Sequence, residues 1–261
     1  MISKNQIKWV RQLEMKKFRQ REGLFVAEGP KVVGDLLACG YMPQQLFATP
    51  EWKGWNGADG LPGDDSRRFA CEEWTEVNDE ELRRLSFLQH PQQVLAVFPI
   101  PQSRSELQGT RRLSLVLDGV QDPGNLGTII RMADWFGIDT IYCSPETADA
   151  WNPKVVQATM GSIARVNIIY INIAELLGST TLPVYGTLLD GENIYEQELG
   201  DEGFIVMGNE GNGISPAVRP LVTRKLLIPA FSNSTTSRAE SLNVAIATAI
   251  VCSEFRRRVK K

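Results

Sequence analysis

Apolar and polar positions change their pattern near residue 105, and the two parts of the chain predict different structures. Before that point the apolar runs are short and separated by polar stretches. They predict modest elements in the order helix to about residue 21, strand 24–27, helix 30–39, helix 78–86 and strand 93–98. The stretch 50–66 is rich in Gly, Pro and Asp, which indicates a surface loop.

After residue 110, strand-like runs alternate regularly with helical ones. The predicted strands are 113–120, 139–144, 167–171, 183–189, 204–208 and 225–230, and the predicted helices are 125–137, 153–165, 172–178 and the segment from 241 onward. This alternation predicts an α/β fold with a mostly parallel sheet and helices on both faces. In such sheets ligands bind beyond the carboxyl ends of the strands.

The domain boundary is expected in the segment 99–110, which has two prolines and few apolar residues and indicates a linker. We therefore assign residues 1–98 to a first domain and 111–261 to a second. No apolar run is long enough to span a membrane, and the charged N-terminus lacks the apolar core of a signal peptide. Four widely separated cysteines predict neither a disulfide framework nor a zinc site, so a cytoplasmic location is expected.

Positive charge is concentrated near the N-terminus, although the net charge of the chain is −3. Between residues 4 and 21, seven Lys or Arg residues stand against one acid, Glu14. Segregation of charge of this kind is typical of a polyanion-binding face. A solvated helix without a ligand is the alternative interpretation.

Two loops of the second domain each follow a predicted strand and carry a distinctive polar residue. The first contains Asn125, which can cap the following helix or face a ligand, and Arg131 lies six residues later. The second is GNEGNGIS at 208–215, where Glu210 stands among three glycines that permit close backbone approach. Each loop alone is also typical of an ordinary turn.

A third loop leads into SLNV at 241–244, where Ser241 or Asn243 can cap the last helix. Three strand ends of one parallel sheet can converge on a single crevice. The only histidine, His90, precedes the linker, so a His-based nucleophilic triad in the second domain is excluded, and no Cys/His cluster predicts a metal site. Backbone donors, Asn, Ser, Glu and Arg remain, and these suit the positioning of an already activated reagent.

In this order the three motifs resemble those of the SpoU (TrmH-like) RNA 2′-O-ribose methyltransferases. They are Asn125-x-Gly-x-x-x-Arg131, the stretch 208–215, and Ile228-Pro229 followed by SLNV, and the match covers about residues 105–255. PKVVQATMGSIARV resembles the family's stretch between the first two motifs. The N-terminal segment resembles the small L30e-like RNA-binding domain that precedes the catalytic domain in many members.

The resemblance implies a C-terminal deep trefoil knot, a homodimer, and S-adenosylmethionine as cofactor. It places the substrate site near the subunit interface. Asn125, Arg131, Glu210 and Asn243 match positions assigned to catalysis or RNA placement. The residues expected to line the cofactor pocket are Thr187, Leu188, Gly208, Asn209, Gly211, Ile228, Ser241 and Leu242.

The reaction implied is methyl transfer to a ribose 2′-hydroxyl, and its proton acceptor is left open. An arginine ordinarily stays protonated, so we expect Arg131 to grip the neighbouring phosphate rather than act as a simple base. Glu210 is a second candidate base, or it orients Asn125 or Arg131. Structured RNA is expected to be held by the N-terminal cations Lys4, Lys8, Lys16, Lys17, Arg19 and Arg21.

Ribosomal RNA is the preferred substrate, because an appended domain suits a large folded RNA, and transfer RNA is the alternative. A noncatalytic RNA-binding protein is a second hypothesis, but pure binding does not need all the motif residues. A nucleotide-dependent oxidoreductase is disfavoured because no GxGxxG follows a strand. The segment 230–240 is longer than in most family members, and it is expected to cover the cofactor, touch RNA or form a solvated insertion.

Overall fold

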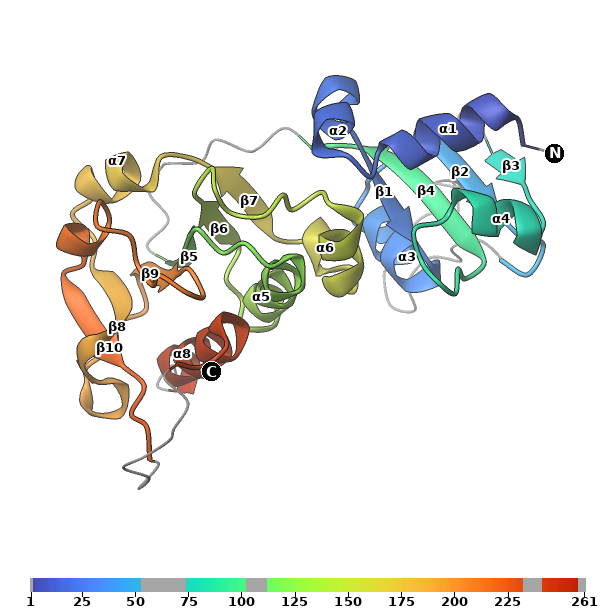
Figure 1. The fold of residues 1–261 in the computed structure, drawn as a ribbon. Helices are drawn as coiled ribbons and strands as arrows, with labels where there is room; N and C mark the ends of the chain where they lie inside the picture. The colour runs from blue at the N-terminus through green and yellow to red at the C-terminus, as the bar shows by residue number, and fades with distance from the viewer. Residues whose placement is uncertain (1, 53–73, 102–111, 232–240, 258–261) are drawn as a thin grey trace, which may run out of the picture. The chain divides into compact units, whose positions relative to one another are not determined.

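The protein is described here by a computed structural model (Figure 1). The structure describes residues 2–52, 74–101, 112–231 and 241–257. The predicted linker and the segment 230–240 therefore lie largely outside the described residues. Contacts divide the chain into two compact units, residues 1–102 with 149–165 and residues 103–148 with 166–261. The segment 149–165, which belongs by sequence to the second domain, thus folds with the first unit.

The first unit is built on a four-stranded sheet in the order β1-β4-β2-β3. Its strands are β1 (Leu24–Glu28), β2 (Gln45–Ala48), β3 (Trp74–Glu76) and β4 (Val94–Pro99). β4 pairs antiparallel with both β1 and β2, whereas β2 and β3 are parallel. The burial of β1 on both faces explains its continuous apolar run LFVA.

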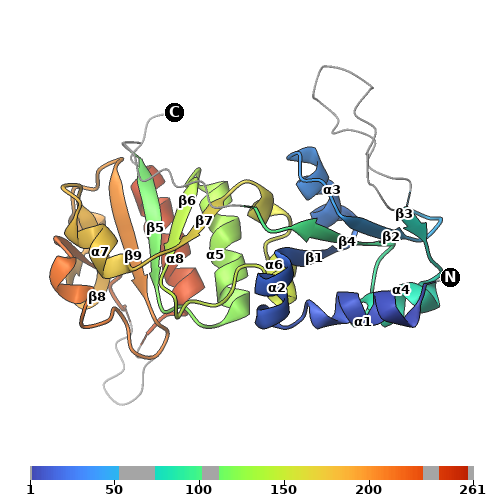
Figure 2. The ribbon, with the colours of Figure 1, turned by 90° about the horizontal axis from the view of Figure 1, so that it is seen from above.

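Helices cover both faces of this sheet (Figure 2). α1 (Lys4–Gln12) and α4 (Asp79–Leu85) bury Val10, Leu13, Leu82 and Leu85 in one apolar cluster with side chains of β1 and β4. α3 (Pro30–Ala38) lies on the opposite face. The remaining helices of the unit are α2 (Lys16–Glu22), α6 (Pro153–Ala158) and the short 3₁₀ helix η1 (Ser162–Ala164).

Two helices of this unit differ from the sequence prediction. The single helix expected to residue 21 is broken into α1 and α2, because the carbonyl oxygens of Leu13 and Glu14 accept hydrogen bonds from the Arg19 guanidinium. The helix expected at 153–165 ends at Ala158. Met160 and Gly161 take φ angles of 52° and 95°, which an α-helix cannot contain.

The second unit is a six-stranded, entirely parallel sheet in the order β10-β8-β9-β5-β6-β7, which confirms the predicted fold class. Its strands are β5 (Leu113–Asp118), β6 (Thr140–Cys143), β7 (Asn167–Tyr170), β8 (Val184–Asn193), β9 (Gly203–Gly208) and β10 (Arg224–Leu227). β10 is shorter than the predicted 225–230. It pairs with Gly186 and then with Glu192, so residues 187–191 of β8 leave the ladder.

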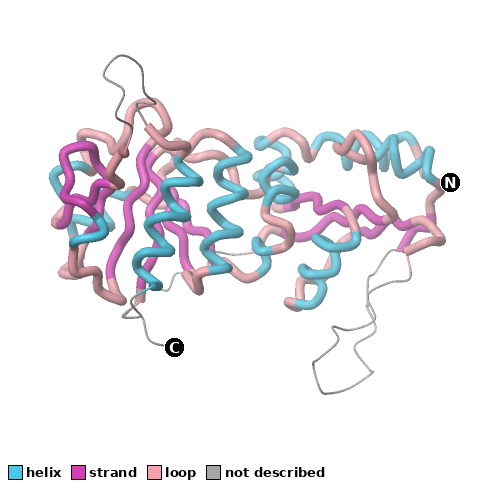
Figure 3. Tube along the Cα trace, turned by 90° about the horizontal axis from the view of Figure 1, so that it is seen from below, coloured by secondary structure: helices cyan, strands magenta, loops and turns pink. Residues whose placement is uncertain are grey.

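Helices α5 (Pro123–Trp135) and α8 (Val244–Arg257) pack side by side across one face of this sheet (Figure 3). α7 (Ile173–Gly178) packs on the other face, where Ile173, Leu176 and Leu177 join a buried cluster with strand residues. The 3₁₀ helices η2 (Ile194–Glu196) and η3 (Arg219–Leu221) complete the unit. No helix of the described residues has both the length and the apolar character needed to cross a bilayer.

Candidate active site

The loop after β9 is shaped by Asn209, whose side chain is bonded at both ends within the protein. Its Oδ1 accepts hydrogen bonds from the backbone N–H groups of Gly211 and Asn212, at 2.9 and 3.0 Å. Its Nδ2 donates to the carbonyl oxygen of Gly119 at 2.7 Å. The loop also needs a glycine at 208, because a Cβ there would lie 2.2 Å from the carbonyl carbon of Gly213.

The loop after β5 is tied to the same region. Asp118, the last residue of β5, accepts a hydrogen bond from the backbone N–H of Ser215 at 2.7 Å. Asp122 then caps α5 by accepting from the backbone N–H of Asn125 at 2.7 Å. Because Asp122 is the cap, the side chain of Asn125 is available for another contact.

Motif residues that follow three separate strands are in contact, because Asn125 is bonded to both Glu210 and Asn243. Its Nδ2 donates to Oε1 of Glu210, and its Oδ1 accepts from Nδ2 of Asn243, each at 2.9 Å. Oε2 of Glu210 also accepts a longer bond of 3.4 Å from the backbone N–H of Gln121. The convergence expected from the parallel sheet is therefore present for Asn125, Glu210 and Asn243.

The orientation of both amides follows from the network itself. Oδ1 of Asn243 accepts from the backbone N–H groups of Ala245 and Ile246 at the start of α8, as the predicted cap of this helix. Its amino group must therefore point to Asn125, and Asn125 must present its oxygen to it. The amino group of Asn125 is left to face Glu210. Each hydrogen bond is therefore donated in the same direction. The series begins at the N-terminus of α8, the positive end of its dipole, and ends at the exposed carboxylate of Glu210.

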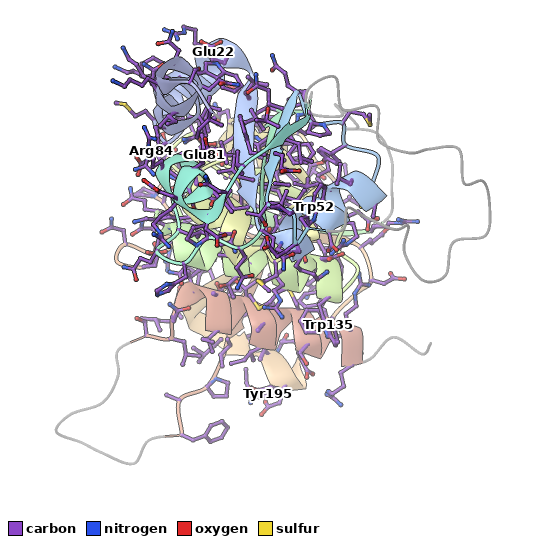
Figure 4. The ribbon with its side chains drawn as sticks, turned by 90° about the vertical axis from the view of Figure 1, so that its right-hand side faces the viewer. Glu22, Trp52, Glu81, Arg84, Trp135 and Tyr195 are labelled. Atoms are coloured by element: carbon purple, nitrogen blue, oxygen red, sulfur yellow. The ribbon has the colours of Figure 1, made fainter. Side chains whose placement is uncertain are left out.

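Arg131 is not part of this network. It lies six residues beyond Asn125 on α5, so its side chain leaves the helix about 240° around and about 9 Å along the axis from that of Asn125. It is exposed and has no hydrogen-bond or ion-pair partner within the described part of the chain. Trp135, one turn further along, is 84% exposed (Figure 4).

The predicted cofactor residues lie beside the same strand ends. Thr187 follows the last β8 residue that is paired with β9. Its hydroxyl donates to the carbonyl oxygen of Val206, with 3.4 Å between the two oxygens. Leu188 is buried, whereas Gly211, Ser241 and Leu242 are exposed. Ile228 is half-buried directly after β10. No group of three or more His, Cys, Asp or Glu side chains among the described residues is placed to hold a metal ion.

The N-terminal cations divide into two classes, and one prediction among them is wrong. Arg19 is 1% exposed and binds the Asp149 carboxylate through Nε and Nη2, so it is a structural residue and not an RNA contact. The sequence of a charged segment does not reveal which of its residues is buried, and this explains the error. Arg21 is exposed but paired with Glu22. The four predicted lysines are all exposed: Lys4, Lys8, Lys16 and Lys17.

Sequence reasoning missed the two aspartates that organise the site. Asp118 is 8% exposed and ends a strand whose other residues are apolar except Ser114, which is the signal that could have indicated its role. Asp122 was also not identified from the sequence, although Asp followed by Pro is a typical start of a helix.

Comparisons with known proteins agree with this geometry. The family model described as the SpoU rRNA Methylase family matches residues 112–253, and the MRM3-like substrate binding domain matches residues 4–96. The chain is 31% identical to the 23S rRNA (guanosine(2553)-2′-O)-methyltransferase RlmP of Bacillus subtilis over an alignment of 259 residues that covers 97% of each chain.

Solved structures are similar over the whole length. A TrmH-family protein from Porphyromonas gingivalis is 42% identical with a TM-score of 0.84, covering 99% of this chain and 100% of that one. The AdoMet-bound rRNA methyltransferase from Sinorhizobium meliloti is 28% identical with a TM-score of 0.83, covering 100% and 97%. The chain therefore belongs to the SpoU rRNA methylase family and is an S-adenosylmethionine-dependent RNA 2′-O-methyltransferase.

Proposed function

We propose that the protein methylates one ribose of ribosomal RNA and that Asn125, Glu210 and Asn243 place the reacting hydroxyl. The observation that carries this proposal is the hydrogen-bonded chain from α8 through Asn243 and Asn125 to Glu210. Ribosomal RNA is favoured over transfer RNA because the full-length relative from Bacillus subtilis is a 23S rRNA methyltransferase. The first unit matches a substrate-binding domain, as a large folded RNA would require.

The strand ends fit a bound S-adenosylmethionine. Leu189, Phe231 and Leu242 are 80%, 82% and 48% exposed, and each adjoins or belongs to a segment predicted to hold the cofactor. Exposed apolar side chains at these positions fit a ligand with an apolar body. Residues 187–191 leave the sheet ladder, so their backbone groups are available to an adenosine. When bound, the cofactor supplies a methyl group that its sulfonium makes electrophilic.

The residues of the chain then have to place the ribose and accept a proton. Asn125 fixes the carboxylate of Glu210, which faces solvent at the end of the donor chain. We assign to Glu210 the orientation of the 2′-hydroxyl and a share in accepting its proton, and to Arg131 the phosphate next to the target ribose. Positioning of this kind supplies up to about 7–11 kcal/mol of the barrier reduction in intramolecular reactions.

Arg131 reaches the site in a homodimer. Thr128, Arg131 and Trp135 are spaced three and four residues apart on α5, so they share one exposed face. On α8, packed beside α5, Ile246 is 53% exposed. Exposed apolar side chains on the helix that carries Arg131 and on its neighbour fit a contact with a second copy of the chain. We infer that Arg131 of one subunit serves the Asn125–Glu210 site of the other.

Three further inferences follow from the family. The exposed lysines of α1 and α2 hold RNA phosphates without reading sequence. The C-terminal segment forms a deep trefoil knot, as the family resemblance implies. The protein works in the cytoplasm, where its buried thiols Cys143 and Cys252 stay reduced.

The choice of substrate class is tested by fractionation. Ribosomal and transfer RNA are purified from a strain that lacks the gene, and each is incubated with the protein and S-adenosylmethionine labelled in its methyl group. The proposal predicts label in the ribosomal fraction. Label confined to transfer RNA overturns the ribosomal assignment. No label in either fraction, together with no cofactor binding by calorimetry, favours the noncatalytic alternative.

A further inference from the structure

The first unit carries a depression that none of the predicted RNA contacts occupies. It lies between α4 and the loop that leads into β4, has a volume of about 490 Å³, and is lined by Asp79, Leu82, Arg83, Gln89, His90 and Pro91. Arg83, Gln89 and His90 are exposed, whereas Leu82 is only 1% exposed. The depression thus has polar groups at its rim and an apolar group beneath them.

The tertiary structure connects this depression to the basic face of α1. Lys4, Lys8 and Arg11 are spaced four and three residues apart on α1, so they form one exposed stripe. The Arg11 guanidinium lies over the Phe87 ring, 4.9 Å from its centre, and donates to the carbonyl oxygen of Ser86, the residue after α4. The cationic surface therefore continues from α1 across residues 86–87 toward the rim of the depression.

The cations of this surface are available to a ligand. Lys4, Lys8 and Arg83 have no ion-pair or hydrogen-bond partner among the residues that the structure describes. This distinguishes them from Arg19, buried against Asp149, and from Arg21, paired with Glu22. When unpaired cations neutralise RNA phosphates, counterions condensed on the RNA are released, so binding becomes salt-dependent.

The loop that forms the rim is held in place by a buried carboxylate. Glu28, at the end of β1 and 5% exposed, accepts hydrogen bonds from the Ser86 hydroxyl and from the backbone N–H of Phe87, the latter at 2.9 Å. The Ser86 hydroxyl oxygen in turn accepts from the backbone N–H of Leu88 at 3.0 Å. The start of the rim loop is therefore fixed before a ligand arrives, which lowers the entropic cost of binding.

The chemistry of the rim fits a nucleotide better than a simple anion. Arg83 and His90 offer N–H donors to a phosphate, and Gln89 offers both a donor and an acceptor to a base edge. Asp79 offers only acceptors, which repel a free anion but can receive a 2′-hydroxyl or an exocyclic amino group. The volume lies within the range of small-ligand sites, about 300–1,000 Å³.

We propose that this depression binds one unstacked nucleotide from a loop or bulge of the substrate RNA. Proteins read RNA mostly at such unpaired positions, where phosphate, ribose and base edge are all accessible. The inference rests on the proposed function, since it assigns a recognition site for the same RNA. The helices α1 and α2 contact RNA phosphates, and the depression adds a contact that depends on the conformation of the RNA.

The test compares a double variant with a matched control on the opposite face of the same sheet. Arg83→Gln combined with His90→Ala removes the two rim donors, whereas Lys31→Gln removes one exposed cation from α3. Binding to a 23S rRNA transcript is measured by fluorescence anisotropy at several salt concentrations. Methyl transfer is measured at varied concentrations of the same transcript.

We expect the double variant to raise Kd and KM for the transcript about tenfold or more, with kcat and cofactor affinity unchanged, and Lys31→Gln to change neither by more than about twofold. Arg83→Gln alone should lower the slope of log K against log salt by about one. Unchanged Kd in the double variant overturns the site. Because binding is measured directly, this result is distinct from failure of the proposed function, in which the wild-type protein transfers no methyl group to ribosomal RNA.

Discussion

The amino group of Asn125 donates to the carboxylate of Glu210 with 2.9 Å between Nδ2 and Oε1, although 85 residues separate them in the chain. The other end of Asn125 is fixed by Asn243, which α8 orients in turn. The amide of Asn125 therefore has one possible orientation, and it presents a donor to Glu210. The direction of this donor chain can be tested with substitutions that preserve its shape.

Asn125→Asp keeps the size of the side chain but replaces the donor with a second carboxylate. The new oxygen would face Glu210, where the two like charges would repel at this distance, whereas Asn243 would keep its bond to the retained oxygen. We expect kcat to fall about tenfold to a hundredfold, since a lost positioning hydrogen bond to a charged group costs about 1.5–3 kcal/mol. Single-turnover methyl transfer to ribosomal RNA measures it. Wild-type kcat in Asn125→Asp, with the fold intact by circular dichroism, would contradict the role of the donor.

Mixing two inactive variants tests whether Arg131 acts across subunits. Arg131→Ala and Glu210→Gln should each abolish turnover with cofactor binding intact. If Arg131 serves the partner's site, a heterodimer of the two variants contains one complete site. An equal mixture, refolded or co-expressed, should then recover roughly a quarter of wild-type activity by the statistics of a symmetric dimer.

The control for this experiment uses the exposed face of α5. Adding Trp135→Glu to both variants should leave the monomer folded, because the side chain is 84% exposed, but should prevent recovery by blocking association. Light scattering measures the oligomeric state. If the mixture stays inactive while heterodimers are present by mass spectrometry, Arg131 acts within its own subunit and the proposed exchange is wrong.

The buried pair of Arg19 and Asp149 predicts a stability defect in place of an RNA-binding defect. Asp149 is 13% exposed, and Arg19→Met would leave its carboxylate without the guanidinium. Breaking a buried pair in this way costs about 3–5 kcal/mol of unfolding free energy. Urea denaturation measures it, with Arg21→Met at an exposed position as the control, expected within about 0.5 kcal/mol of wild type.

The double variant Arg19→Met/Asp149→Asn should be less unstable than the sum of the two single changes, since the unpaired charge is removed. Equal stability of Arg19→Met and Arg21→Met would show that the pair is not formed in solution. Deletion of residues 1–98 would leave residues 149–165 without the unit with which they fold. Such a deletion would expose the apolar side chains of Trp151, Val155 and Val156, which fold with the first unit.

Glu28 predicts a pH dependence of stability. Burial raises the pKa of its carboxyl above the usual 4.5, with the bonds from Ser86 and Phe87 acting in the opposite direction. The folded state therefore binds the proton more tightly than the unfolded state, so the contribution of Glu28 to stability is largest at low pH and is lost as pH rises through the raised pKa. The unfolding free energy of wild type minus that of Glu28→Gln should decline as the pH rises above the usual carboxyl pKa of 4.5 and through the raised pKa.

Urea denaturation of both proteins across this pH range measures the difference. A difference that grows with rising pH would mean that the folded protein prefers the ionised carboxylate. Cys143 and Cys252 do not contribute to this range, because burial raises the pKa of the Cys143 thiol and raises that of Cys252 to about 12.

The alternation of apolar runs was sufficient to predict the parallel sheet, because each strand and helix of the second unit buries its own apolar pattern. The motif order predicted that Asn125, Glu210 and Asn243 come together, since parallel strands deliver their ends to one edge. It could not predict that Asp122 caps α5, because Asp122 and Asn125 are both good caps and only the exact first turn decides between them.

Features that depend on tertiary contact were not predictable from patterns along the chain. In the sequence Arg19 does not differ from its charged neighbours, because its partner Asp149 lies 130 residues away. Arg83 and His90 are separated from the N-terminal cations by about 70 residues, and only the packing of α1 against α4 places them on one surface. Met160 and Gly161 end α6 through backbone conformations that helix periodicity does not report.

The central claim is tested most directly by the chemical position of the transferred methyl group. Ribosomal RNA from a strain lacking the gene is methylated by the purified protein with labelled S-adenosylmethionine and then hydrolysed with alkali. A 2′-O-methyl group blocks cleavage at its own nucleotide, so the account predicts that the label is recovered in one alkali-resistant dinucleotide, and that Asn125→Asp greatly slows its appearance. Label recovered in mononucleotides, as methylation of a base would give, would contradict the account.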